Sequence, residues 1–291
     1  MFQTPSPLPS HVPAAVTDRL GVKVGERFVG NCSGADVFRI DSPDEGPCYL
    51  KLMFESGVAG RSAAAARGMV DGDSLPGECE RLDWLATKLG ADGGVGLPRV
   101  LAFETKTTPA GHWTYLLTSA APGRPLHEAM DQTPIRAGRL LGQTLRLLHD
   151  LDPSGCPAWH APDDLISRAQ AHLDHGTRHG VSVGPRGSDP AELRRKLRKL
   201  QSRPPTRFDP VVSHGDYCLP NVLAGLDDTC AVVDLGGVTV ADRHLDLATA
   251  VRSLRFNRGR DDVISVFLNW YGRDRVDPDR LAFYSELCEI I

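Results

Sequence analysis

The sequence predicts an α+β fold of two lobes, a small N-terminal antiparallel β lobe with one helix and a larger, mainly α-helical C-terminal lobe. Two observations lead to this prediction. Short segments with partial two-residue alternation fill the first 119 residues, whereas beyond about residue 135 apolar residues recur at helical spacing. A chain of 291 residues, of which 41% are hydrophobic and 24% charged, is long enough for one large domain or two small lobes.

The N-terminal lobe is expected over residues 18–119. Its helix begins near Pro76, and leucines spaced three and four residues apart give this helix an apolar stripe that would dock on the sheet. Residues 1–17, which contain four prolines, are expected to form a flexible leader. The expected strands cover residues 23–30, 35–42, 47–54, 98–105 and 112–119.

The C-terminal lobe is expected over residues 125–291. Pro122 and Gly123 break the last strand of the N-terminal lobe, so residues 120–124 are the expected hinge. The first helix of the C-terminal lobe should run from Ile135 to Leu151, where leucines form one apolar face. Further helices are expected at about residues 161–174, 190–201, 242–256, 260–272 and 278–288.

Composition and charge exclude several classes of protein. The formal net charge of -4 argues against a protein whose main partner is nucleic acid, and no apolar run is long enough to span a bilayer. The N-terminus lacks the basic and apolar regions of a secretory signal. The seven cysteines are scattered and form no C-x-x-C pair, which favours reduced thiols in the cytoplasm. The sequence leaves open whether the protein is a monomer or a homodimer.

One segment, VVSHGDYCLPNVLAGLDDTCAVVDL at residues 211–235, carries most of the functional information. It places Asp216, then Asn221 five residues later, then Asp234 at the end of the following hairpin. This order matches the catalytic loop and the Mg-binding Asp of protein kinases. Magnesium prefers hard oxygen ligands, and Asn221 and Asp234 each offer one, while Asp216 remains free to accept the hydrogen bond of an attacking alcohol. ATP and Mg²⁺ are therefore the expected cofactors of a protein-kinase-like fold.

Each of these three residues also has a purely structural interpretation. Asp216 could cap the turn after a strand, Asp234 could end a strand at a tight turn, and Asn221 could adopt left-handed geometry. The three together, in register, favour phosphoryl transfer.

A lysine and a helical acid complete the expected phosphate site. Lys51 lies between two leucines of the third strand, so its side chain should point to the opposite sheet face from theirs. Glu78 lies in the first turn of the helix near Pro76, and such a pair fixes an ammonium group on the α and β phosphates. Glu80 is a rival partner, and Lys51 could alternatively protect a sheet edge. The small, polar link at residues 30–34 could lie over the phosphates.

Five stretches together carry a family resemblance. HGDYCLPN, VDLGGVTVADRHLDLATAVRSL, the E-x-x-R-L-x-W-L helix, CPAWH and the final DRLAFYSELCEII resemble the aminoglycoside phosphotransferases, particularly the 3′-phosphorylating kanamycin and neomycin kinases. The likeness runs from about Val24 to the last residue. It implies a two-lobed kinase fold and ATP-dependent phosphorylation of an aminoglycoside hydroxyl, which gives antibiotic resistance.

The resemblance also implies roles for single residues. Asp216 would orient the drug hydroxyl, Asn221 and Asp234 would hold magnesium, and Lys51 with Glu78 would bind phosphate. On the nucleotide, Ser33 would lie over the β-phosphate, and the backbone of Ser119 and Ala121 would bind adenine. On the drug side, the implied residues are Glu289, the carboxylate of Ile291, and Arg252.

The sequence departs from the family pattern on the drug side. Gly237 replaces an arginine that the relatives carry, and the tail ends in Cys-Glu-Ile-Ile rather than Asp-Glu-Phe-Phe. Residues 163–209, expected to match an acidic substrate loop, contain a basic run at residues 194–199 that is interpreted as a solvated helix face. These departures leave open a streptomycin 3″-phosphotransferase or a kinase of another small alcohol. A non-catalytic nucleotide-binding protein is the third hypothesis, and the complete set of kinase-type residues argues against it.

Overall fold

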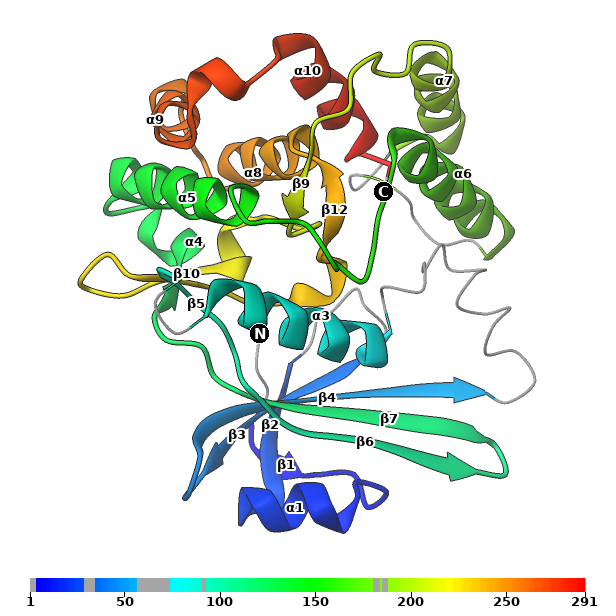
Figure 1. Ribbon diagram of the computed structural model, residues 1–291. Helices are drawn as coiled ribbons and strands as arrows, with labels where there is room; N and C mark the ends of the chain where they lie inside the picture. Colours follow the sequence, from blue (N-terminus) through cyan, green and yellow to red (C-terminus); the bar gives the residue numbers. More distant parts are fainter. Residues whose placement is uncertain are drawn as a thin grey trace.

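The computed structural model describes residues 4–28, 35–56, 74–90, 93–179, 184 and 188–290. These residues form two lobes, a sheet-based N-terminal lobe and a mainly helical C-terminal lobe (Figure 1). The predicted two-lobed α+β architecture is therefore confirmed. Ser33 and Ile291, both predicted site residues, lie outside the described residues.

The N-terminal lobe is built on an antiparallel six-stranded sheet with strand order β1-β2-β3-β4-β7-β6. Every predicted strand is present, with ends shifted by a few residues. The strand β1 was not predicted. The strands are β1 (Ser6–Pro7), β2 (Val24–Phe28), β3 (Asp36–Ser42), β4 (Gly46–Ser56), β6 (Val100–Thr108) and β7 (Gly111–Ser119).

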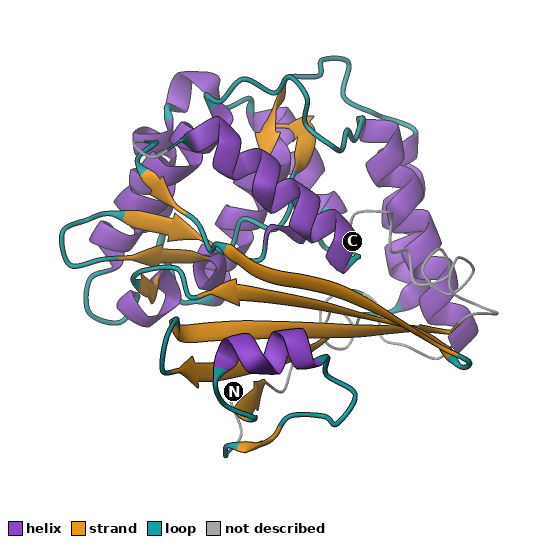
Figure 2. Cartoon of the chain, turned by 60° about the horizontal axis from the view of Figure 1, so that its bottom comes forward, coloured by secondary structure: helices purple, strands orange, loops and turns teal. Residues whose placement is uncertain are grey.

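The leader predicted over residues 1–17 is wrong for the part that the structure describes. Residues 4–17 contribute β1, which pairs with β2, and most of helix α1 (Ala14–Leu20). Val16 and Leu20 are fully buried against Leu50 and Leu52 of the sheet. Figure 2 shows α1 lying across the sheet. The described residues of this lobe therefore contain a second helix besides the predicted one. The prolines misled the prediction, because the apolar residues between them bury enough surface to order the segment.

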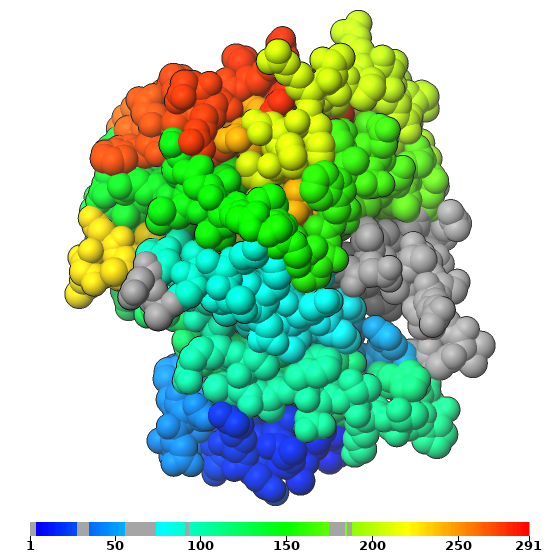
Figure 3. Space-filling view, viewed as in Figure 1, coloured from blue at the N-terminus to red at the C-terminus, as the bar shows by residue number. Residues whose placement is uncertain are grey.

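Helix α3 (Leu75–Leu89) covers the opposite face of the sheet. Its N-cap Ser74 accepts a hydrogen bond from the Gly77 amide, and Pro76 occupies the first turn, where its missing N–H costs nothing. Its leucine stripe is buried, but the prediction that the stripe docks on the sheet is wrong: Leu82, Leu85 and Leu89 pack into the core of the C-terminal lobe. Leu75, at the start of the helix, packs on the sheet instead. In the space-filling view α3 lies between the two lobes (Figure 3). The helix therefore brings its first-turn acid to the junction of the lobes.

The C-terminal lobe contains the predicted helices. One start differs: residues 239–242 form strand β12, so the helix expected from residue 242 begins at His244. The α-helices are α4 (Leu126–Ala129), α5 (Pro134–His149), α6 (Pro162–His179), α7 (Pro190–Gln201), α8 (His244–Phe256), α9 (Asp261–Tyr271) and α10 (Pro278–Leu287).

Two small sheets hold the loops of the C-terminal lobe. One has strand order β5-β11-β10-β8, and the other pairs β9 with β12. Strand β5 precedes β6 in sequence, yet it pairs with β11, so it fastens the N-terminal half of the chain to the helical lobe. The strands are β5 (Val95–Gly96), β8 (Arg124–Pro125), β9 (Pro210–Ser213), β10 (Val222–Ala224), β11 (Cys230–Val232) and β12 (Thr239–Asp242).

Candidate active site

The loop His214–Asp216 leaves the buried strand β9 and passes very close to a second turn. Gly215 has φ of +83°, which favours glycine, and a Cβ at this position would lie 2.2 Å from the Gly237 carbonyl oxygen. Any side chain at residue 215 would push the two turns apart. Gly237 therefore lies directly against the loop that carries Asp216.

Helix α8 holds this loop at two points. The buried carboxylate of Asp246 accepts hydrogen bonds from the His214 amide at 2.7 Å and the Gly215 amide at 3.0 Å. Two helical turns further on, Ser253 Oγ accepts a hydrogen bond from the Leu219 amide at 3.0 Å. The loop is fixed on both sides of Asp216, and neither anchor was predicted. The only signal in the sequence was their spacing of seven residues, which places them on one helical face.

His149 supports Asp246 from helix α5. Burial would raise the pKa of Asp246, but hydrogen bonds from His149 and from the loop lower it. Burial lowers the pKa of His149, against the opposing effect of Asp246. An ionised Asp246 beside a neutral His149 agrees with the lowered pKa values of both groups. We therefore assign the proton to His149 Nε2, which lies 3.1 Å from Asp246, while Nδ1 accepts from the Tyr271 hydroxyl at 2.9 Å.

Asp216 and Asn221 are in direct contact. Asn221 Nδ2 donates to the backbone oxygen of Asp216 at 3.0 Å and to its carboxylate at 3.1 Å. Asn221 is buried, whereas Asp216 is exposed. With its amide nitrogen used in this way, Asn221 directs its Oδ1 away from Asp216, as a cation ligand requires.

The hairpin β10–β11 brings Asn221 and Asp234 to the same end. Val222 pairs with Val232, and the Val233 amide donates to the Asn221 carbonyl at 3.0 Å. Asp234 follows directly, with φ 63° and ψ 60°, a left-handed conformation that is uncommon for a residue with a side chain. Such a conformation needs support from its surroundings, and it is common at functional sites.

Lys51 joins the two lobes through its charge. Its Nζ donates to Glu78 at 2.6 Å and to Asp234 at 2.8 Å. The leucines beside Lys51 face α1 and Lys51 itself faces α3, as the strand alternation predicted. Glu80, the rival partner, is exposed. Burial would lower the pKa of Lys51, but the two carboxylates raise it above its usual range. Burial likewise would raise the pKa of Asp234, but Lys51 holds it below its usual range.

Arg81, which the sequence did not identify as a site residue, ties α3 to the turn after Asp234. Its buried Nε donates to the Val238 carbonyl at 2.7 Å. Arg81 lies three residues after Glu78, so both side chains project from the same face of the helix. The position of Glu78 is therefore coupled to the segment that carries Asp234.

The predicted adenine contacts lie where β7 ends. The Ser119 amide donates to the Arg99 carbonyl at 2.9 Å, and the Ala120 amide donates to the Pro47 carbonyl at 2.8 Å. Within the described ranges, the Ala121 amide has no such partner. Ala121 can therefore donate to a ligand from this position.

The predicted drug-side residues are already engaged within the protein. Arg252 Nη1 donates to the Cys288 carbonyl at 2.7 Å, and Glu289 forms an ion pair with Lys196 of α7. Two further basic residues of α7 lie near acids. The interpretation of the run at residues 194–199 as a solvated face is wrong for Arg194 and Lys196, which are partly buried, and holds for Lys199, whose side chain is 60% exposed. The other two pairs are Arg194 with Asp174 and Lys199 with Glu286.

The residues fit a magnesium ion that is shared with a nucleotide. In the described part of the chain no group of three or more His, Cys, Asp or Glu side chains could hold a metal by itself. Asn221 and Asp234 offer two hard oxygens, and Mg²⁺ commonly takes its remaining ligands from water and substrate phosphates. The donor set therefore suits a nucleotide-bound magnesium and not an all-protein metal centre.

Comparison with known proteins gives consistent matches. Residues 31–284 match a family model described as a phosphotransferase enzyme family. An aminoglycoside 3′-phosphotransferase from Niallia circulans is 33% identical over 218 residues, 74% of this chain and 78% of the relative. The crystal structure of an aminoglycoside-3′-phosphotransferase of type VIII is 28% identical, with a TM-score of 0.68, over 92% of this chain and 94% of its own.

A third similar protein was solved with ligands. Aminoglycoside phosphotransferase APH(3″)-Id from Streptomyces rimosus, in complex with ADP and streptomycin, is 26% identical, with a TM-score of 0.62. The alignment covers 90% of this chain and 94% of that one.

Proposed function

Since this chain belongs to the phosphotransferase enzyme family, we propose that it transfers the γ-phosphoryl group of ATP to the 3′ hydroxyl of a kanamycin- or neomycin-type aminoglycoside, and so gives antibiotic resistance. One observation carries this proposal: Lys51 of the sheet lobe contacts Glu78 of α3 and Asp234 of the helical lobe at once. That contact places a phosphate-binding cation beside a metal-binding acid, as phosphoryl transfer from a nucleotide requires.

Each predicted residue has a role in this reaction. Asp216 aligns the acceptor hydroxyl, whose oxygen forms a bond to the γ-phosphorus as the bond to the ADP oxygen breaks. Lys51, positioned by Glu78, binds the α and β phosphates. Asn221 and Asp234 would hold Mg²⁺, which would neutralise charge on the phosphate oxygens. The nucleotide-binding site is completed by Ser33, which would lie over the β-phosphate, and by the backbone of Ser119 and Ala121, which would bind adenine.

A second candidate acceptor is favoured by the drug side of the site. Glu289, the acid expected to bind the drug, is already paired with Lys196. Phosphorylation of the 3″ hydroxyl of streptomycin, or of another small alcohol, would use the same catalytic residues. The full set of kinase-type side chains argues against a protein that only binds nucleotide.

Localisation and assembly follow from less direct observations. None of the helices in the described part of the chain combines the length and the apolar run that crossing a bilayer demands. Each of the six cysteines in the described ranges is a free thiol. Reduced thiols support a cytoplasmic enzyme, which acts as a monomer or a homodimer.

A coupled assay of ADP production tests the proposal. The enzyme is assayed with kanamycin, neomycin, streptomycin and no acceptor, and NMR then locates the phosphate on the product. Rapid turnover of kanamycin or neomycin with phosphate on the 3′ oxygen is the expected result. Turnover confined to streptomycin would favour the second candidate, and ADP production that no acceptor increases would reject both.

A further inference from the structure

The basic face of α7 neutralises acids from the elements that pack against it. Arg194 pairs with Asp174 of α6 at 2.8 Å, and Lys199 lies 3.6 Å from Glu286 of α10. Lys196, between them on the helix, pairs with Glu289 just beyond α10. Of these three acids, Glu289 belongs to the C-terminal tail, which comprises residues 288–290 after α10.

Helix α8 positions the tail and the catalytic loop together. Arg252 donates to the Cys288 carbonyl at 2.7 Å, and Thr249 Oγ1 lies 3.6 Å from the Cys288 thiol. From the same helix, Asp246 and Ser253 hold the loop that carries Asp216. Cys288, the residue before Glu289, is therefore held on the helix that also holds the loop of Asp216.

The electrostatics agree with this placement. Burial raises the pKa of the Cys288 thiol to about 11, and the negative charge of Asp216 adds to the shift. The positive charge of Arg252 lowers the pKa of two thiols, those of Cys218 in the catalytic loop and Cys288 in the tail. Asp216 and Arg252 therefore both lie close enough to Cys288 to influence its thiol electrostatically.

We propose that Lys196 is a specificity-determining residue for the acceptor, an internal cation that competes with an ammonium group of the substrate for the carboxylate of Glu289. This inference rests on the proposed function, since it concerns a cationic acceptor. The side chains of Lys196 and Glu289 are 26% and 39% exposed, so the pair is partly hydrated and a ligand can displace it. Each polycationic acceptor must displace Lys196 before it gains this carboxylate, so Lys196 lowers the affinity for the most cationic drugs.

Lys196→Met tests the proposal because it removes the charge and keeps the aliphatic stem. We expect its Kd for neomycin, measured by titration calorimetry without nucleotide, to fall about twofold to fivefold, the range that a partly exposed ion pair supports. Its KM for neomycin should fall similarly, with kcat and the KM for ATP unchanged. Lys199→Met is the matched control, since it removes the same charge one turn away, and its Kd should stay near that of the wild type.

The double variant Lys196→Met/Glu289→Gln should lose the gain, because the freed carboxylate is then absent. The proposal is overturned if Lys196→Met binds neomycin no better than the wild type, if Lys199→Met gives an equal gain, or if the gain persists without Glu289. The binding readout is independent of turnover. A wild-type enzyme that phosphorylates no aminoglycoside would therefore reject the proposed function, while the Kd values would still decide the role of Lys196.

Discussion

The two site aspartates occupy very different surroundings. Asp216 is exposed and accepts a hydrogen bond from Asn221, which leaves its carboxylate available to an incoming hydroxyl. Asp234 is paired with Lys51 and is held in a left-handed backbone conformation. This difference supports the proposed roles, acceptor alignment for Asp216 and cation binding for Asp234.

Replacing Asp216 should abolish alignment of the acceptor and leave nucleotide binding intact. We expect Asp216→Ala to lower kcat by about a hundredfold to ten-thousandfold, the usual effect of losing a positioned acid or base. The Kd for ATP, from fluorescence titration, should change little. Asp227→Ala, in the turn of the β10–β11 hairpin, is the control and should retain its activity. An unchanged kcat in Asp216→Ala would remove Asp216 from the catalytic role.

Lys51 should set the pH range over which Asp234 remains ionised. The pKa of Asp234 is depressed in the folded protein, so the stability that its charge contributes is present above the unfolded pKa and is lost as pH falls through the folded pKa. In Lys51→Met the raising effect of burial on the pKa of Asp234 is opposed only by the smaller effect of His214.

An NMR titration of labelled aspartate carboxylates should therefore show the pKa of Asp234 moving upward in Lys51→Met. Lys106→Met removes an exposed lysine of β6 and serves as the control, with no change expected. A pKa of Asp234 that is the same in Lys51→Met and in the wild type would contradict the assigned ion pair.

At the scale of single elements, α1 and β1 belong to the fold of the N-terminal lobe. Leu20 is fully buried, together with Val12 and Val16, on the sheet face that α3 leaves uncovered. Without this layer the leucines of β4 would face water on one side. The segment therefore supports the strand that carries Lys51.

Leu20→Ala should destabilise the protein by about 2–5 kcal/mol, because it removes buried methyl groups and leaves a cavity. Urea unfolding monitored by circular dichroism measures the change. Val24→Ala, on the exposed side of β2, should cost less than about 1 kcal/mol. Equal effects of the two substitutions would indicate that α1 contributes nothing to the folded lobe.

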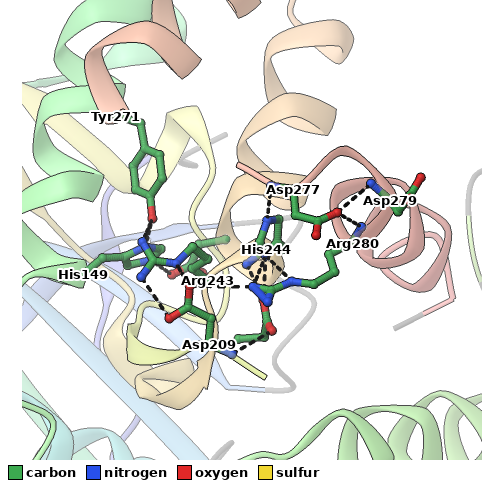
Figure 4. A network of polar contacts seen from close by, with 10 residues as sticks. His149, Asp209, Arg243, His244, Tyr271, Asp277, Asp279 and Arg280 are labelled. Atoms are coloured by element: carbon green, nitrogen blue, oxygen red, sulfur yellow. Dashed lines mark hydrogen bonds and ion pairs between the residues drawn. The ribbon is translucent and has the colours of Figure 1, made fainter. Parts of the chain in front are cut away.

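At the scale of the whole molecule, a polar network joins helices α5, α8, α9 and α10 of the C-terminal lobe (Figure 4). Tyr271, at the end of α9, lies between His149 of α5 and Arg243 at the start of α8. Arg243 in turn pairs with Asp209, just before β9. Because His149 also contacts Asp246, displacement of any of these helices would reach the loop of Asp216.

Tyr271→Phe should lower the free energy of unfolding by about 1–3 kcal/mol, because two buried polar groups lose their partner. Tyr284→Phe provides a matched control. In the described residues, the buried Tyr284 hydroxyl has no hydrogen-bond partner, so its removal should be neutral or slightly stabilising. Urea unfolding of both variants decides the comparison, and a neutral Tyr271→Phe would show that the network adds nothing to stability.

We infer that residues 120–124 act as the hinge between the lobes. Gly123 has φ of +105°, and a Cβ there would lie 2.8 Å from the backbone of Ala224. The chain therefore crosses β10 too closely for any other residue, which fixes the crossing point at one end of the expected hinge.

The sequence alone determined the chemistry and most of the secondary structure. The spacing of Asp216, Asn221 and Asp234 predicted the hairpin that brings Asn221 and Asp234, the proposed magnesium ligands, to one end. Strand pairing across a short turn follows from local sequence. The alternation around Lys51 predicted the face on which its partner lies, for the same reason.

Only the tertiary structure decided the contacts between residues far apart in the chain. Lys51 and Asp234 are 183 residues apart, and Lys196 and Glu289 are 93 apart. No local pattern specifies which of several charges meet over such separations, since the packing of the lobes and helices sets those distances. The anchoring of the loop by Asp246, the burial of α1 and the neutralised tail acid were unpredicted for this physical reason.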